Sequence, residues 1–286
     1  EKKDLNLQKT GSLNISEKLF NVIIEGKDFQ IKFDRKIGRL ISVNYDGLEY
    51  FISPPELNFW RPPTDNDEKD INGLRKWKKQ ELDKLQHGLY SFDYKQLSDN
   101  AVQVNVRENI VVDRTKLKID ALYSYTILGN GEIVLYVHIN PVPELELFPK
   151  VGLQMKFLDN FSRFKWYGRG PHETYPDRKA SGKIDVYEMK VEDLFEPYIM
   201  PQENGNRTDV RWAVISADDG RGLYIDGTGL LHMSASYYED KNIEEAQHLY
   251  ELEKSDYTIL DVDYKMAGLG TAACGPGCRP EYIVPA

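Results

Sequence analysis

Hydrophobic and polar residues alternate in short runs over most of the chain, and turn-forming residues separate the runs. We expect strands at residues 20–25, 30–34, 39–45, 101–112, 122–128, 132–139, 150–157, 164–167, 211–218, 222–226, 230–235 and 258–268. The segment Gly129-Asn130-Gly131 suits a tight hairpin, because its residues tolerate positive φ. Many strands joined by short turns, without alternating helices, are typical of an antiparallel sandwich. The pattern therefore predicts an all-β fold, a large antiparallel β-sandwich.

Two short segments have a helical period instead. In residues 70–85 the apolar side chains, among them Leu74 and Trp77, fall roughly on one face. Residues 242–252 place Ile243 and its apolar neighbours in the same way. We expect two short helices that cover a sheet.

The domain organisation follows from the same pattern. Residues 1–16 are polar and non-periodic, which predicts a linker or strap, and residues 17–286 are expected to form one sandwich domain. We find no internal repeat and no low-complexity tract. The chain begins with Glu1 and has no apolar leader, which fits a fragment of a longer chain, although a trimmed signal peptide would look the same.

Composition and charge exclude several classes of partner. A hydrophobic content of 41% with 12% aromatic residues is ample for a core and excludes a disordered chain. A formal charge of −9 argues against nucleic acid and against an anionic membrane. The sequence also contains no apolar run of the ~20 residues that a membrane span needs. The abundant aromatic rings suit a neutral ligand such as a sugar, but they suit a β-rich core equally well.

The densest chemistry lies in residues 166–178 and 197–212, where arginines, carboxylates and aromatic rings crowd beside glycine and proline. Such a composition suits a polyol-binding face or a tightly docked interface. It suits equally a rigid corner held by arginine–carboxylate pairs.

Four motifs in order resemble one family. Residues 33–35 with 37–40 look like its opening hairpin, and residues 58–67 carry an Arg-x-Pro-x-Asp-Asn-Asp signature. Residues 168–178 read Gly-x-Gly-Pro-x-Glu-x-Tyr-x-Asp-Arg, and residues 201–205 read Pro-x-Glu-Asn-Gly. Together they are similar to the C-terminal, small-chain domain of the β-galactosidases of glycoside hydrolase family 2.

The resemblance implies a two-sheet supersandwich related to galactose mutarotase. It also implies that both catalytic glutamates lie in an upstream (β/α)8 barrel of ~250 residues, acting in cis or in trans. The segment would complete the substrate pocket and the subunit contacts of an oligomeric, retaining enzyme that acts on terminal β-D-galactosides. Alone it would be inactive and would hold no cofactor, since the family's Mg and Na sites lie elsewhere.

The candidate residues come from the signatures, and we expect none of them to be catalytic or to bind a metal. Glu173 and Glu203 could bond sugar hydroxyls or act as acid and base, but arginine-rich surroundings would hold them ionised in structural pairs. We expect eight residues of the two central signatures and their surroundings to form one connected polar cluster: Arg169, Glu173, Tyr175, Asp177, Arg178, Glu203, Asn204 and Arg207. The residues expected to bind carbohydrate or shape the pocket are Arg61, Asp65, Arg169, Glu173, Tyr175, Arg178, Glu203, Asn204 and Cys274.

The last loop departs from the resembled family. The family's loop carries a Trp that stacks on the sugar, whereas this chain has no Trp after Trp212 and places Cys274, Gly275 or a gap there. Cys274 and Cys278 favour unpaired thiols, with a local disulfide or a shared metal as alternatives. The compartment, cytoplasmic or periplasmic, is not settled by two cysteines.

Two other functions stay open at this stage. The chain could be a free-standing carbohydrate-binding module. It could also be an aldose-epimerase-like enzyme, which would need a His and a carboxylate as acid and base. His172 lies inside a signature, but at its variable position.

Overall fold

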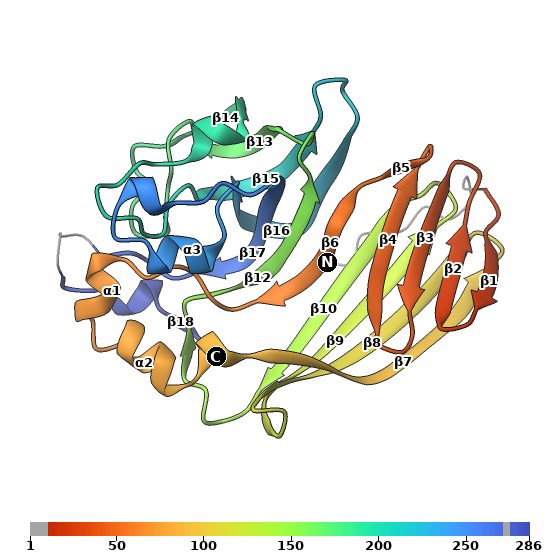
Figure 1. The fold of residues 1–286 in the computed structure, drawn as a ribbon, viewed down its shortest axis with the longest axis horizontal. Helices are drawn as coiled ribbons and strands as arrows, with labels where there is room; N and C mark the ends of the chain where they lie inside the picture. Colours follow the sequence, from red (N-terminus) through yellow and green to blue (C-terminus); the bar gives the residue numbers. More distant parts are fainter. Residues whose placement is uncertain (1–10, 271–274) are drawn as a thin grey trace. The chain divides into compact units, whose positions relative to one another are not determined.

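The computed structural model describes residues 11–270 and 275–286, and it confirms the all-β class. The strands form sheets of five, four, two and seven strands (Figure 1). All pairings in the first three sheets, and those from β14 to β12 in the seven-stranded sheet, are antiparallel. Contacts divide the chain into two compact units. The first unit holds the described residues up to Pro54 and Lys84–Leu145, and the second holds Pro55–Asp83 and Glu146–Ala286. The chain thus passes twice into each unit.

The first unit is a two-sheet sandwich. One sheet has the order β1-β2-β3-β4-β5 and the other the order β10-β9-β8-β7. Phe33 of the first sheet meets Tyr125 of the second edge to face, with ring centroids 5.2 Å apart. Buried residues alternate with more exposed ones along β3 and along β8 from Val102 onward, which gives each sheet one core face. The strands are β1 (Asn14–Lys18), β2 (Asn21–Glu25), β3 (Phe29–Asp34), β4 (Arg39–Tyr45), β5 (Leu48–Glu49), β7 (Gln86–Ser98), β8 (Ala101–Val112), β9 (Lys116–Leu128) and β10 (Ile133–Pro141).

The second unit is built on a seven-stranded sheet with the order β14-β13-β15-β16-β17-β12-β6. Its core contains the stacked rings of Phe164 and Trp166, both fully buried. A small two-stranded sheet pairs β11 (Leu147–Phe148) with β18 (Val284–Pro285). It joins the start of the long second segment of this unit to its C-terminal end. The seven strands are β6 (Phe51–Asn58), β12 (Lys150–Leu158), β13 (Arg163–Gly170), β14 (Lys183–Lys190), β15 (Arg207–Ser216), β16 (Gly222–Ser236) and β17 (Tyr257–Met266). Of β6, only the part from Pro55 belongs to this unit.

All predicted strands are present, but the two predicted at residues 222–226 and 230–235 form one strand, β16. The hairpin at Gly129–Gly131 is confirmed, with Gly131 at φ 86°. Seven strands were missed: the short β1, β5, β11 and β18, and the longer β6, β7 and β14. β7 and β14 are edge strands with many exposed residues, so their sequences lack the one-sided burial that produces a clear alternation.

The predicted helix over residues 70–85 is wrong as one continuous helix. The structure has α1 (Asp65–Lys69), α2 (Leu74–Lys79) and a 3₁₀ turn at Leu82–Lys84. α2 begins only after Gly73, where no larger residue fits because a Cβ would lie 2.1 Å from the backbone oxygen of Asp67. α2 ends at Lys79, and Glu81, at φ 63°, separates it from the 3₁₀ turn. The later turn is shaped by Gln80, whose side chain donates to Leu147 O (3.1 Å) and accepts from Glu146 N (2.6 Å).

The predicted helix over residues 242–252 is also divided. α3 spans Asp240–Glu245, and after extended Ala246 a 3₁₀ turn follows at Leu249–Glu251. The Glu251 carboxylate accepts from the backbone N–H groups of Gln247 and His248 at 2.6 and 3.2 Å. A side chain that satisfies free backbone donors in this way starts a new turn. A membrane-crossing helix needs ~20 apolar residues, and the helices of the described ranges are too short and too polar for that.

The N-terminal strap differs in part from the expectation. β1 begins at Asn14 and pairs with β2, so residues 14–16 belong to a sheet. Residues 1–10 of the predicted linker lie outside the described residues. One domain over residues 17–286 stays a prediction.

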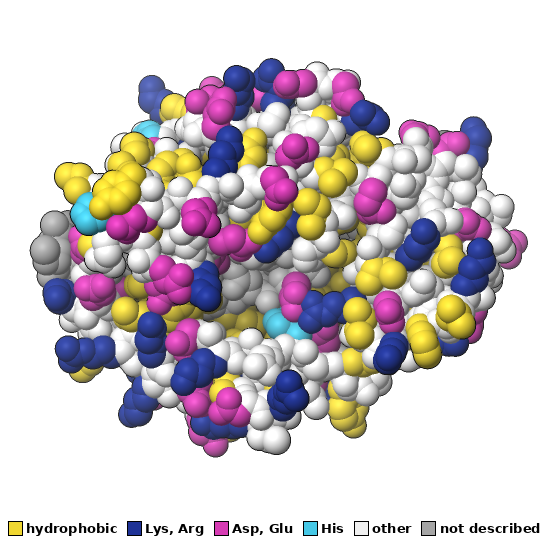
Figure 2. Space-filling model, in the orientation of Figure 1, with side chains coloured by type: hydrophobic (Ala, Val, Ile, Leu, Met, Phe, Trp, Pro, Cys, Tyr) yellow, Lys and Arg dark blue, Asp and Glu magenta, His cyan; other side chains and the backbone are white. Residues whose placement is uncertain are grey.

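The surface charge is mixed. On the face seen in Figure 2, Lys and Arg side chains alternate with Asp and Glu side chains. This pattern on the visible face fits the net charge of −9 and does not resemble the basic stripe of a nucleic-acid-binding protein.

Gly152 offers a test of the packing in the second unit. It lies at a bulge of β12, where a Cβ would come within 1.9 Å of Asp263 Oδ1 and 2.6 Å of Asp263 Cα. Because backbone must move, we expect Gly152→Ala to lower the free energy of unfolding by about 1–3 kcal/mol or more, measured by urea denaturation. Gly229→Ala is the matched control, since no atom lies within 4 Å of its Cβ position. Equal stability of the two variants would contradict this packing.

Candidate functional site

The first signature, residues 58–67, folds around the buried guanidinium of Arg61. Arg61 is fully buried and donates through Nη1 to Asp67 Oδ2 (2.8 Å) and through Nη2 to Asp67 Oδ1 (3.1 Å). The guanidinium carbon of Arg61 lies 5.0 Å from the centroid of the Trp77 ring. A two-pronged arginine–carboxylate pair fixes both position and orientation. Arg61, predicted to shape a pocket, is thus an internal brace of the second unit.

The acidic residues after Arg61 cap α1. Thr64 Oγ1 and the Asp67 carboxylate form a reciprocal capping box at the start of the helix, with Thr64 N donating to Asp67 Oδ2 at 2.8 Å. Asp65, the predicted site residue, is exposed in the first turn, and its N–H contacts Gln202 Oε1 at 3.4 Å. The Asp-Asn-Asp run of the signature therefore begins a helix, and its second Asp caps that helix. Within residues 11–270 and 275–286, no His, Cys, Asp or Glu group has the arrangement of a metal site.

Glu173 is the centre of the second signature. Its buried carboxylate accepts from the Arg178 guanidinium, from the Tyr198 hydroxyl and, at 2.8 Å, from the backbone N–H of Gly205. Three donors from three segments converge on one side chain. Glu173 therefore joins residues 173–178, the loop at Tyr198 and the signature at 201–205.

Glu203 lies in the same neighbourhood and differs chemically from Glu173. Its Oε1 accepts a hydrogen bond from the fully buried Tyr175 hydroxyl at 3.0 Å, and Arg178 lies 5.5 Å from the Tyr175 ring centroid. Burial raises the pKa of Glu203 to about 8, although the charges of Arg61 and Lys150 act in the opposite direction. The prediction that arginines hold Glu203 ionised is therefore wrong. At neutral pH desolvation outweighs those charges and the carboxyl group is mostly protonated.

A further group of buried charges, which sequence reasoning missed, lies on β12 and β17. Lys150 donates to Asp261 Oδ1 at 2.8 Å and has Asp263 Oδ2 at 3.7 Å. Burial raises the pKa of Asp263 well above its ordinary value, and it raises the pKa of Asp240 to about 6. The sequence did contain a signal for this group. Asp261 and Asp263 are two residues apart in an apolar strand, so their side chains lie on the same face.

The predicted eight-residue cluster is only partly connected. Arg169 belongs to a separate group, in which it donates to Asp209 Oδ2 (2.5 Å) beside Lys179 (2.9 Å to Asp209 Oδ1). Asn204 braces its own loop through Gln202 O and Glu196 N. Arg169 has its partner 40 residues away in sequence, and Asn204 bonds backbone groups, which every residue possesses. The motif alone could therefore not identify these partners.

Arg207 completes the core of the signatures. It is almost fully buried and donates to the carbonyl oxygens of Gly205 (2.6 Å) and Pro171 (3.1 Å). His172, in contrast, is exposed and contacts Ser181 Oγ at 2.9 Å. A contact with a hydroxyl group does not form the His–carboxylate pair that an epimerase-like reaction requires.

The signatures hold the near end of the last loop. Asp177 accepts from the N–H groups of Leu269 (3.1 Å) and Gly270 (2.7 Å), and Asn66 donates to Leu269 O at 2.8 Å. On the far side, Gly275 N donates to Asn66 Oδ1. Cys274 lies outside the described residues. Cys278 is a free, half-buried thiol whose pKa burial raises to about 11, so it stays protonated at neutral pH.

The protonation of Glu203 makes stability depend on pH. With a folded pKa of about 8 against an ordinary value of 4.5, folded Glu203 keeps a proton that the unfolded chain has lost in this window. Rising pH between these values must therefore destabilise the fold. We expect the free energy of unfolding of the wild type, relative to Glu203→Gln, to fall by at least about 1.4 kcal/mol across the window. Urea unfolding at several pH values measures this, and a pH-independent difference would contradict it.

The hydrogen bonds from the last loop to Asp177 can be tested at individual amides. Asp177→Ala removes the acceptor of two backbone N–H groups, so the Leu269 and Gly270 amides should exchange with solvent roughly tenfold faster or more. Hydrogen-exchange NMR measures both amides. Asp159→Ala, at an exposed turn position, is the control and should leave them unchanged. Unaltered exchange in Asp177→Ala would show that other contacts hold the loop.

Comparison with known proteins agrees with this architecture. The chain is 32% identical over 266 residues to a beta-galactosidase of Priestia megaterium, covering 91% of this chain and 24% of the relative. It is 31% identical over 276 residues to one from Lactobacillus delbrueckii subsp. bulgaricus, covering 93% and 26%. It is 30% identical over 281 residues to one from Halalkalibacterium halodurans, covering 96% and 27%. The chain thus spans about a quarter of the length of these relatives. The profile of the family described as beta galactosidase small chain matches residues 25–286, and the chain belongs to that family.

Proposed function

We propose that this chain is the C-terminal sandwich region of a β-galactosidase and acts together with a catalytic barrel supplied in cis or in trans. The observation that carries the proposal is the coverage: more than nine tenths of the chain aligns with about a quarter of each relative. The complete enzyme would be a retaining hydrolase of terminal β-D-galactosides. Its remaining three quarters would contain the catalytic carboxylates and any metal sites.

The geometry of the signature residues favours a structural role over a catalytic one. Retaining hydrolysis needs two carboxyl groups ~5–5.5 Å apart that both reach one glycosidic bond. Glu173 already accepts three hydrogen bonds within the protein, and Glu203 is buried beside Tyr175. Such carboxyl groups brace loops. In the proposal, the braced loops complete the substrate pocket of the barrel.

The outer face of the seven-stranded sheet carries exposed apolar and aromatic side chains. On β14, Ile184 and Val186 are 44% and 47% exposed. The neighbouring strands continue the surface with a ladder of rings, in which Trp212 lies between Tyr167 and Tyr224 at centroid distances of 6.2 and 6.0 Å. Exposed apolar and aromatic groups side by side mark interaction surfaces. We propose that this face packs against another part of the β-galactosidase, in the same or a neighbouring subunit.

Complementation tests the proposed function. We expect the purified 286-residue chain alone to release no product from a chromogenic β-galactoside, because loss of either catalytic carboxyl group alone removes several powers of ten in rate. Adding the separately expressed remainder of the enzyme should restore turnover. Turnover by the chain alone, above a mock preparation, would overturn the proposal. A lack of turnover in the mixture would favour a free-standing binding module.

The proposed contact face can be tested in the same assay. Val186→Glu places a charge on the exposed apolar edge at a position that is 47% exposed, so it should weaken complementation at least tenfold and leave the melting temperature unchanged. Leu117→Glu, an equally exposed apolar residue of β9, is the matched control and should complement normally. Equal complementation by both variants would exclude this face as the contact.

A further inference from the structure

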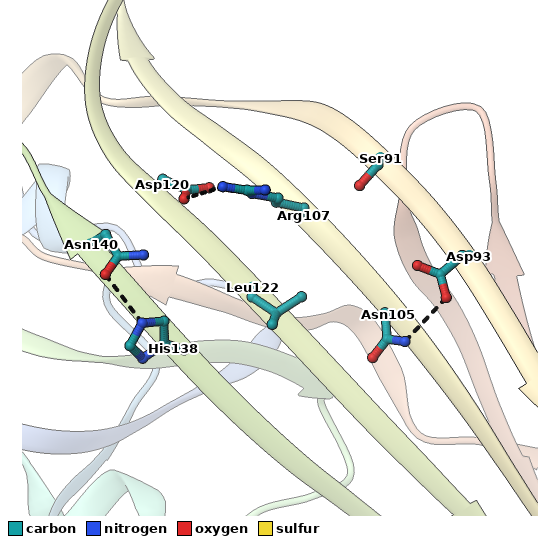
Figure 3. A pocket seen from close by; sticks show the side chains of 8 residues that line it. All are labelled: Ser91, Asp93, Asn105, Arg107, Asp120, Leu122, His138 and Asn140. Atoms are coloured by element: carbon teal, nitrogen blue, oxygen red, sulfur yellow. Dashed lines mark hydrogen bonds and ion pairs between the residues drawn. The ribbon is translucent and has the colours of Figure 1, made fainter. Parts of the chain in front are cut away.

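The outer face of the four-stranded sheet in the first unit carries a hollow that the proposed function does not use. It has a volume of about 420 Å³ and is lined by side chains of β7, β8, β9 and β10 alone (Figure 3). This volume lies within the range of small-molecule sites, roughly 300–1,000 Å³. All lining residues belong to the first unit, so the hollow is complete within it.

One side of the hollow is a network built on Arg107. Its Nε and Nη2 donate to the two carboxylate oxygens of Asp120 at 2.8 and 2.7 Å. These hydrogen bonds hold the pKa of Asp120 below its ordinary value. Asn140 also hydrogen-bonds Asp120, and its Oδ1 lies 3.1 Å from His138 Nε2. The result is a row of planar donors and acceptors across three strands.

The opposite side has a second network. Asn105 donates to Asp93 Oδ1 at 3.1 Å and accepts from Ser124 Oγ at 2.8 Å, and Gln103 donates to Ser124 Oγ at 3.1 Å. Figure 3 shows Leu122 between the two networks. The hollow therefore has an apolar centre with oriented amide, carboxylate, guanidinium and imidazole groups on either side.

Two exposed aromatic rings flank this arrangement. Tyr136 is 61% exposed and lies two residues before His138 on β10, so it occupies the same face. Tyr90 is 63% exposed, with the Arg107 guanidinium carbon 5.2 Å from its ring centroid. Rings that remain exposed beside polar groups can pack against an apolar ligand face.

The chemistry of the hollow selects among ligand classes. Its one guanidinium is already paired with Asp120, and Asp93 adds a second carboxylate, so an anion would meet net negative charge. A pyranose has the complementary form, because it combines an apolar C–H face with a ring of hydroxyl groups that each donate and accept. We infer that this sheet face is a binding site for a neutral saccharide, independent of the reaction that the complete enzyme performs.

Saccharide binding by the 286-residue chain tests the inference. The probes are lactose, D-galactose and D-glucose, titrated while the side-chain N–H signals of Arg107, Asn105 and Asn140 are followed by NMR. We expect at least one sugar to bind saturably in the millimolar range and to shift these signals. Inorganic phosphate, added as a competitor, should not displace it. The absence of saturable binding by all three sugars, or displacement by phosphate, would overturn the inference.

Matched variants locate the site. Arg107→Ala removes the charged donor of one network and should weaken sugar binding roughly tenfold or more. Arg35→Ala is the control, since Arg35 is a similarly exposed arginine of the first unit that pairs with Glu17. Should Arg107→Ala fail to fold, as judged by its melting temperature, the exposed His138→Ala serves instead. Undiminished affinity in a folded Arg107→Ala or His138→Ala variant would place the sugar elsewhere and refute this site.

Discussion

The second unit depends on the buried ion pair between Arg61 and Asp67. A guanidinium keeps its charge at every accessible pH, so burying it completely requires an anion that is oriented and hydrogen-bonded. Asp67 meets this requirement with two hydrogen bonds to Arg61 and at the same time caps α1. Loss of one partner of such a pair typically costs about 3–5 kcal/mol. The pair therefore determines the path of the chain from the end of β6 into α1, and with it the position of Asn66.

The surrounding charges follow from that burial. Lys150 supplies a second buried cation, while Glu203, Asp240, Asp261 and Asp263 supply four nearby carboxyl groups. Carboxyl groups in excess of the cations cannot all ionise easily in a desolvated space, and burial accordingly raises the pKa of both Glu203 and Asp263. Charge and hydrogen bonding together link β12, β17 and the signature loops. This explains why the carboxyl groups of the signatures have a bracing geometry.

The two units differ in the chemistry that they present. In the second unit, the polar residues of the signatures are turned inward, and the outer face of the seven-stranded sheet carries exposed rings and aliphatic groups. In the first unit, the core is mostly apolar, with Glu108 and Lys118 as buried exceptions, and polar residues of β7–β10 lie outward as ordered networks. An inward network positions loops, and an outward network is available to a ligand. The proposed division between support of the enzyme and saccharide binding rests on this contrast.

The sequence by itself determined the all-β class, the hairpin at Gly129–Gly131 and, through the signature residues, the family. These features are local or are carried by motif order, so they need no knowledge of distant contacts. Only the tertiary structure decided the ends of α2, because Gly73 lies against the backbone of Asp67 before it and Gln80 binds the backbone of Glu146 and Leu147 after it. The same holds for partners: Arg169 pairs with Asp209 outside both signatures, and the Glu203 carboxyl group keeps its proton because of burial. The polar hollow on β7–β10 also arises only when four strands align in register, since no single strand contains enough of its residues to signal a site.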